Sequence, residues 1–125
     1  MARPDQHFDQ ARQNRDFAEH LLATYPNDPV SMQWAVTAAF YAALHCMTGY
    51  LVQQGVQVFN HQARDAALAN LSNRGAIPFP VYDAYVRLKS RSTGARYDLW
   101  TFSERQVRRQ ILDTYLARIT SFVGL

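Results

Sequence analysis

The feature that most limits how this chain can fold is an apolar run between residues 29 and 54. Alanine, aromatic and aliphatic side chains follow one another from Trp34 to Leu51, so the run is apolar on nearly every side of a helix. A helix of this kind has to be wrapped by other elements. Asp28 is a good N-cap, Pro29 suits the first helical position, and Gly55 stops the pattern. We therefore expect one central helix surrounded by others.

The same run is expected to be a core helix and not a membrane span. It lacks flanking basic anchors, and four polar or small residues interrupt it: Thr37, His45, Thr48 and Gly49. Residues 1–20 lack the apolar core of a signal peptide. The single cysteine, Cys46, excludes an intrachain disulfide framework and a cysteine-based zinc site. These features predict a cytoplasmic protein without membrane contact.

Four further segments have the three- and four-residue apolar spacing that is typical of helices. They cover residues 5–24, about 61–72, 80–93 and 103–123. Gly94 is expected to break the fourth of the five helices, and Ser103 with Gln106 forms a capping box that opens the last. A chain of 125 residues fits a single domain, here residues 1–125. The predicted fold class is all-α, an up-and-down antiparallel bundle of four to five helices.

The charged residues are few and unevenly distributed. They make up 18% of the chain, below the roughly 25% usual for a globular domain, which suggests a buried subunit interface. Residues 1–62 carry a net charge of −2 and residues 63–125 a net charge of +5. Of the 13 basic residues, 12 are arginine, whose planar fork suits phosphate groups. The C-terminal half is therefore either a phosphate-attracting surface or a solvated helical face.

The run WAVTAAFYAALHCMTGYL, residues 34–51, resembles the second helix of small HEPN domains, named for higher eukaryotes and prokaryotes nucleotide-binding proteins. Three more segments fit the same resemblance: RDFAEHLL in the first helix, HQARDAAL from His61, and SRSTGARYD from Ser90. The resemblance implies an up-and-down bundle, a homodimer, and action on RNA or nucleotides. It also implies a possible partner chain, a cognate antitoxin or nucleotidyltransferase, in a bacterial defence or toxin–antitoxin setting.

Catalytic members of that family are metal-independent ribonucleases with an arginine, a spacer of four to six residues, and a histidine. Here Arg91 is followed after four residues by Arg96 and then Tyr97, so an arginine stands in the histidine position. Arginine stays protonated and cannot act as a general base. The resemblance therefore implies a non-catalytic RNA- or nucleotide-associated module, with no catalytic residue assigned. The alternatives are a ribonuclease toxin that takes a histidine from elsewhere in the dimer, and a protein-interaction scaffold without a nucleic-acid role.

The candidate binding residues fall into three groups. The densest basic cluster is expected to bind phosphate groups and a stacked base: Arg87, Arg91, Arg96 and Tyr97. His61 and Arg64, one turn apart at a helix start, form a second candidate anion site. His45 and Tyr41 share a stripe of the central helix and line a possible polar pocket, or serve as core residues. The histidines have no i, i+4 pair, and we expect neither a metal nor a cofactor.

Overall fold

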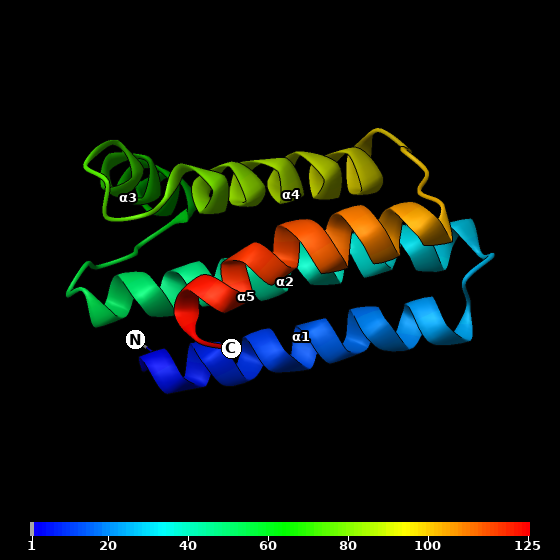
Figure 1. The fold of residues 1–125 in the computed structure, drawn as a ribbon, viewed down its shortest axis with the longest axis horizontal. Helices are drawn as coiled ribbons and strands as arrows, with labels where there is room; N and C mark the ends of the chain where they lie inside the picture. The colour runs from blue at the N-terminus through cyan, green and yellow to red at the C-terminus, as the bar shows by residue number, and fades with distance from the viewer. Residues whose placement is uncertain (1) are drawn as a thin grey trace.

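The computed structural model describes residues 2–125, and within them the chain forms helices and turns without a strand. The elements are α1 (Pro4–Thr24), α2 (Pro29–Gln53), α3 (His61–Asn73), α4 (Phe79–Tyr97), the π-helix η1 (Gln106–Leu116) and α5 (Ala117–Val123). The helices α1, α2 and α4 and the continuous η1–α5 helix run alternately up and down, with the short α3 near one end (Figure 1). The prediction of an all-α bundle is confirmed.

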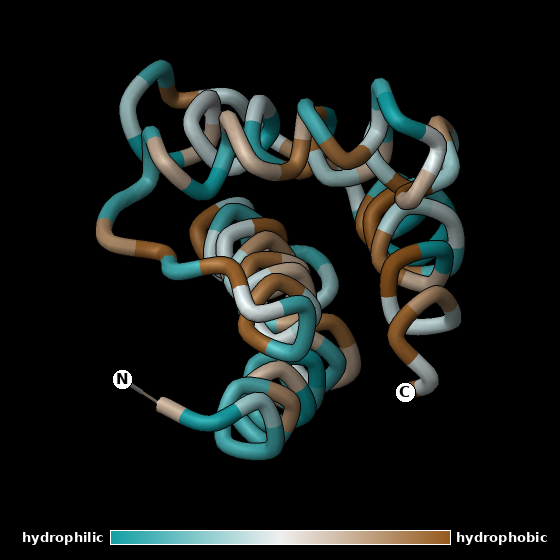
Figure 2. Tube along the Cα trace, turned by 90° about the vertical axis from the view of Figure 1, so that its left-hand side faces the viewer, coloured by the Kyte–Doolittle hydropathy of each residue, from teal (hydrophilic) through white to brown (hydrophobic). Residues whose placement is uncertain are grey.

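The central position of α2 explains its apolar sequence. The other helices surround it on three sides: α1 below, α3 and α4 above, and η1 with α5 beside it (Figure 2). By length and composition α2 is apolar enough to cross a membrane, but 78% of its most apolar 18-residue window is buried inside the bundle. Its side chains form the core together with those that the other helices turn inward, such as Leu22, Leu88 and Ile111.

The close approach of α1 to α2 depends on small residues. Ala11 and Ala18 of α1 are buried. Near the C-terminal end of α2, the ring of Phe8 lies over Gly49, and a Cβ atom at position 49 would lie 2.7 Å from Phe8 Cε1. Glycine is therefore required at position 49 for this ring to pack directly on the α2 backbone.

Two predicted helix starts have the expected capping geometry. The Asp28 side chain accepts a hydrogen bond from the Ser31 amide at 3.2 Å. Ser103 and Gln106 form the predicted capping box: the Gln106 amide donates to Ser103 Oγ at 3.1 Å, and the Ser103 amide donates to Gln106 Oε1 at 2.9 Å. These side chains satisfy amide groups that have no partner within the helix.

The prediction that Gly94 breaks the fourth helix is wrong. Helix α4 continues through Gly94 to Tyr97, and the indole of Trp100 folds back onto the glycine. A Cβ atom at position 94 would lie 2.1 Å from Trp100 Cε3. The helix then ends as the amides of Asp98 and Trp100 both donate to the Gly94 carbonyl, at 3.0 and 3.1 Å. Glycine here provides room for a ring, and the chain turns four residues later than expected.

The last helix was expected over residues 103–123 and is found there, but most of it is a π-helix. The Ala117 amide donates to the Leu112 carbonyl five residues earlier, and Thr114 Oγ1 donates to the Arg109 carbonyl at 2.7 Å. This i→i+5 pattern widens the turn compared with an α-helix. The predicted apolar stripe still faces inward, with Val107, Ile111, Tyr115 and Ile119 buried.

Candidate functional site

The predicted basic cluster on α4 divides between two sides of the helix. Arg91 lies toward η1, with its guanidinium carbon 5.5 Å from the centre of the Tyr115 ring. Arg96 lies toward α2: its guanidinium carbon is 5.7 Å from the Tyr41 ring centre, and its Nη1 donates to the Tyr41 hydroxyl at 3.2 Å. Arg87 and Arg96 are nine residues apart, about two and a half α-helical turns, so they point in opposite directions. The cluster therefore contributes to two sites and not to one.

Arg87 lies in a hollow of about 480 Å³ between α4 and the η1–α5 helix, which we call the basic groove. Its lining is made of polar, basic and aromatic side chains: Asp83, Arg87, Arg109, Gln110, Thr114, Tyr115 and Arg118. Arg87 Nε donates to the Asp83 carboxylate at 2.8 Å. Within residues 2–125, neither Arg109 nor Arg118 has a carboxylate at ion-pair distance. Three arginines against one aspartate leave the groove with a net positive charge.

The π-helix brings Arg109 and Arg118 to the same side of the last helix. Nine residues separate them, which in an α-helix is about two and a half turns and would place them on opposite sides. In the wider i→i+5 helix nine residues make about two turns, and both side chains line the groove. Thr114, between them, lines it as well. The groove therefore depends on the irregular geometry of η1.

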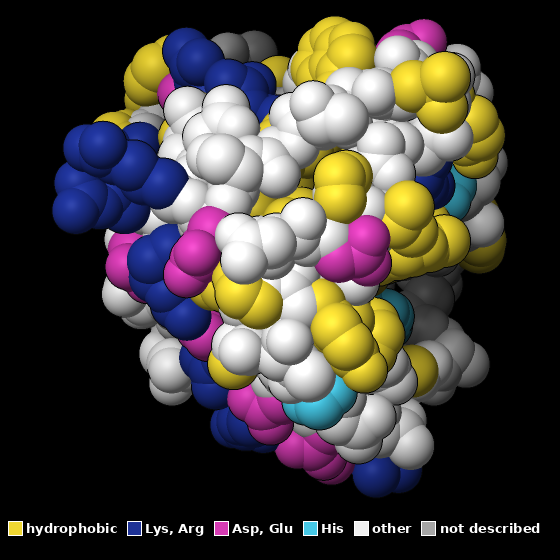
Figure 3. All heavy atoms as spheres, turned by 90° about the vertical axis from the view of Figure 1, so that its right-hand side faces the viewer, with side chains coloured by type: hydrophobic (Ala, Val, Ile, Leu, Met, Phe, Trp, Pro, Cys, Tyr) yellow, Lys and Arg dark blue, Asp and Glu magenta, His cyan; other side chains and the backbone are white. Residues whose placement is uncertain are grey.

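A second hollow of about 380 Å³ continues from the basic groove toward the α4–η1 connection. The two share Gln110, and the second adds a cation and two aromatic rings in its lining: Arg91, Trp100, Thr101, Phe102, Gln106 and Gln110. Figure 3 views this end of the molecule. Basic side chains gather on the left of that view, where η1 lies, and hydrophobic side chains lie mainly to the centre and right. Both hollows therefore lie along η1, which contributes lining residues to each of them.

Arg96 and Tyr97 line a separate hollow of about 400 Å³ between the N-terminal part of α2 and the C-terminal end of α4. We call it the Arg96 pocket; it is lined by Gln33, Trp34, Thr37, Ala95, Arg96, Tyr97 and Leu99. The Arg96 guanidinium carbon is 5.2 Å from the Tyr97 ring centre. Arg96 and Tyr97 therefore lie together in this pocket, on the other side of α4 from Arg87.

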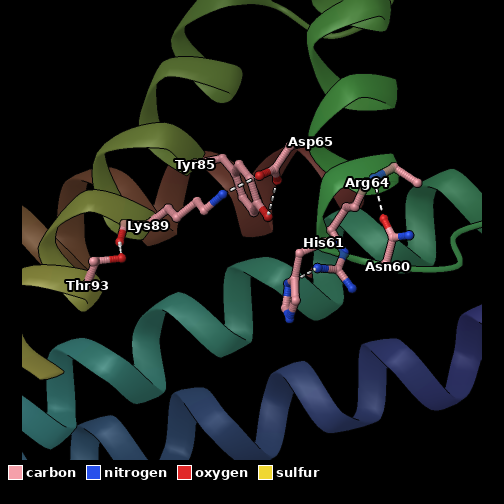
Figure 4. Close-up of polar contacts among 8 residues, drawn as sticks. Asn60, His61, Arg64, Asp65, Tyr85, Lys89 and Thr93 are labelled. Carbon is pink, nitrogen blue, oxygen red and sulfur yellow. Dashed lines mark hydrogen bonds and ion pairs between the residues drawn. The ribbon is translucent and has the colours of Figure 1, made fainter. Parts of the chain in front are cut away.

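His61 and Arg64 lie together, as their spacing predicts, but their polar groups already bind each other and neighbouring side chains of the protein. Arg64 Nη1 donates to His61 Nδ1 at 2.8 Å, and Arg64 Nε donates to Thr48 Oγ1 of α2 at 3.0 Å. Asn60 Oδ1 already accepts the Ala63 amide at 2.8 Å (Figure 4). Arg64 therefore fastens the start of α3 to α2.

The next residue, Asp65, ties α3 to α4. Its carboxylate forms an ion pair with Lys89 and accepts a hydrogen bond from the Tyr85 hydroxyl at 3.3 Å (Figure 4). Burial, together with the negative charge of Asp65, raises the pKa of Tyr85 well above its usual range, so this hydroxyl stays protonated. The α3–α4 contact is thus a structural one, and it also uses the single lysine of the chain.

His45 has a partner that the sequence did not indicate. Its Nδ1 lies 3.1 Å from Nδ1 of His7 on α1, and the two rings stack with centres 5.3 Å apart. One ring must donate and the other accept, which requires the accepting ring to be neutral. Burial is the main cause that lowers the pKa of both histidines, with the Arg64 charge adding to it. Tyr41, one turn before His45, contacts Arg96 instead.

Sequence reasoning missed Arg118, Thr114 and His7. An α-helical wheel places Arg118 away from Arg109, so α-helical spacing could not have joined them. One signal for the π-helix was available: the apolar stripe from Val107 to Ile119 advances in uniform steps of four residues, whereas an α-helical stripe mixes steps of three and four. Among the residues that the structure describes, no group of three or more histidine, cysteine, aspartate or glutamate side chains could hold a metal ion.

No protein-family model matches the chain, and no curated protein matches it.

Proposed function

We propose that the protein is a HEPN-like RNA- or nucleotide-associated binding module that holds phosphate groups in the basic groove. The observation that carries this proposal is the pair Arg109 and Arg118, which line one hollow with no carboxylate partner among residues 2–125. Arginines without acidic partners are available to a phosphate, and a charge-assisted bidentate contact is among the stronger hydrogen bonds in proteins.

The second hollow supports an extended ligand over a single anion. Arg91 stands beside the rings of Trp100 and Phe102 in its lining, directly next to the basic groove. Proteins that bind single-stranded nucleic acid combine a positively charged groove with aromatic rings on which bases stack. A strand of a few nucleotides laid along η1 would meet both features in succession.

The groove's composition supports binding without cleavage. Cleavage of RNA through its 2′-hydroxyl needs a proton acceptor near neutral pH, a role that histidine fills best. No histidine lines the basic groove or the second hollow within the described part of the chain. The carboxylate that lines the groove, Asp83, already accepts a hydrogen bond from Arg87 Nε at 2.8 Å, so it is not free to serve as the proton acceptor instead.

Fluorescence anisotropy with a labelled ten-nucleotide RNA tests the proposal. Arg109→Gln/Arg118→Gln should weaken binding about tenfold or more at low salt, because two phosphate contacts are lost. The slope of log affinity against log salt should fall by about 1.4, since each neutralised phosphate of a single strand contributes about 0.7. Competition with ATP, measured as release of the labelled RNA, distinguishes a site that accepts a free nucleotide from a site that accepts RNA alone.

Arg74→Gln is the matched control, because Arg74 is an exposed arginine at the end of α3 and removes the same charge per substitution. Arg74→Gln should change affinity by less than about twofold. If each groove substitution has no more effect than Arg74→Gln, the binding is a general charge effect and the groove is not the site. RNA cleavage in EDTA by the unmodified protein would contradict the non-catalytic part of the proposal.

A further inference from the structure

The Arg96 pocket has exposed aromatic walls. Its volume is about 400 Å³, within the range of small-molecule sites. Trp34, Tyr97 and Leu99 line it with 55%, 72% and 79% of their surfaces exposed. Large hydrophobic side chains this open, gathered around one hollow, mark a surface that meets something else.

The rim of the pocket is fixed by the fold. Leu99 adopts a left-handed backbone conformation with φ of 59°, which is unfavourable for a residue other than glycine. The residues on both sides of it are held, since the Asp98 and Trp100 amides donate to the Gly94 carbonyl and Gln33 Nε2 donates to the Trp100 carbonyl at 2.9 Å. Strain that the surrounding structure maintains is typical of functional sites. Here it holds the Leu99 side chain at the mouth of the pocket.

The Arg96 guanidinium is the only charged group in the described lining, and it is unbalanced. No carboxylate lies within ion-pair distance of it among residues 2–125. Its Nε donates to the Ser92 carbonyl at 3.3 Å and its Nη1 to the Tyr41 hydroxyl at 3.2 Å. Of the five N–H donors of an arginine, three have no hydrogen-bond partner at Arg96 within the described part of the chain. They form the outer end of a planar fork.

Of the other polar side chains of the lining, Gln33 and Thr37 are already engaged, whereas the Tyr97 hydroxyl and the Trp34 indole N–H remain as neutral donors. Thr37 Oγ1 donates to the Gln33 carbonyl at 3.0 Å, and Gln33 Nε2 is already bonded to the Trp100 carbonyl. The site therefore presents one cationic fork with aromatic and aliphatic walls. The single cation of the lining balances a singly charged carboxylate, whereas a phosphate dianion would leave one negative charge uncompensated.

We infer that the Arg96 pocket binds a planar aromatic carboxylate. The carboxylate accepts hydrogen bonds from the free N–H groups of Arg96, and the aromatic ring packs against Trp34 and Tyr97. The body of such a ligand suits offset or edge contacts with these rings, and its negative charge balances the positive charge of Arg96. This site lies on the opposite side of α4 from the basic groove, so it goes beyond the proposed RNA or nucleotide binding.

Titration calorimetry with indole-3-carboxylate, compared with its neutral analogue indole-3-carboxamide, tests the inference. The acid should bind about tenfold or more tightly than the amide, because only the acid gains the charge-assisted bond to Arg96. Arg96→Gln should remove this preference, Arg96→Lys should retain part of it, and Trp34→Ala should weaken both compounds. Thermal melting of each variant checks that it remains folded.

Arg91→Gln is the matched control, because Arg91 is on the same helix, loses the same charge and lies outside this pocket. It should leave binding of the acid unchanged, as should Arg109→Gln/Arg118→Gln, so a failure here is distinguishable from a failure of the RNA proposal. Equal affinity for acid and amide, or an unaltered preference in Arg96→Gln, would overturn the inference. So would self-association that Trp34→Ala abolishes and the acid does not affect, since the pocket would then be a contact between copies of the chain.

Discussion

Replacing Gly94 with alanine should destabilise the protein, although alanine is the better helix former. Position 94 lies inside α4, where alanine is favoured over glycine by about 1 kcal/mol. The added Cβ would, however, lie 2.1 Å from Trp100 Cε3, so the indole must leave its place. Trp100 is 47% exposed, and the displaced ring would lose the burial of about half its surface.

The free energy lost with the burial of Trp100 is larger than the free energy gained from the helix preference for alanine. A tryptophan offers roughly 200 Å² for burial, so half of it corresponds to about 100 Å². At about 25 cal/mol per Å² the lost burial amounts to about 2.5 kcal/mol. Subtracting the helix preference leaves a net loss of about 1.5 kcal/mol in the free energy of unfolding. For a domain of this size the melting temperature should fall by about 6 °C.

A double-mutant cycle separates the two terms. Trp100→Ala removes the ring, and in that background Gly94→Ala should stabilise by about 1 kcal/mol because only helix preference remains. Urea unfolding followed by circular dichroism gives the four free energies of the cycle, and the expected coupling is about 2.5 kcal/mol. If Gly94→Ala stabilises the unmodified protein as much as it stabilises Trp100→Ala, the ring does not pack on Gly94 and the reasoning is refuted.

Three other predictions concern the rest of the bundle. The pKa values of His7 and His45 in the folded protein lie below the ordinary 6.5, so the stability that these neutral histidines contribute should be fully present above pH 6.5 and should decrease as the pH falls below it. The urea midpoint of unfolding should therefore fall between pH 7.5 and 5.5, and His45→Gln should make this fall smaller. Arg108→Gln breaks the 3.0 Å contact with Glu19 and should lower the free energy of unfolding by about 0.5–1 kcal/mol, because both side chains are about 40% exposed. Thermal melts should show this loss at low salt and a smaller loss in 1 M salt. Burial raises the pKa of the Cys46 thiol to about 12, so at pH 8 a thiol reagent should modify it only at the rate of unfolding, and rapid labelling of the native protein would contradict its burial.

The helices could be predicted from the sequence because their signals are local. Apolar spacing marks the inward faces of α1 to α4, and Asp28 and Ser103 cap the helices that they were expected to begin. The end of α4 could not be predicted in this way. A glycine inside a helical pattern reads as a break, and only the position of Trp100, six residues later, shows that Gly94 accommodates a ring within a continuing helix.

The candidate site was predictable only in part, because it depends on how two helices present their side chains. The run from Arg87 to Tyr97 is one basic segment in the sequence, yet helical geometry sends Arg87 toward η1 and Arg96 toward α2. Conversely, Arg109 and Arg118 would lie on opposite sides of an α-helix, and they line one groove because η1 is a π-helix. The hydrogen-bond pattern of the last helix is therefore what assembles the basic groove. A substitution that restores α-helical geometry there should separate the two arginines and weaken RNA binding without removing a single positive charge.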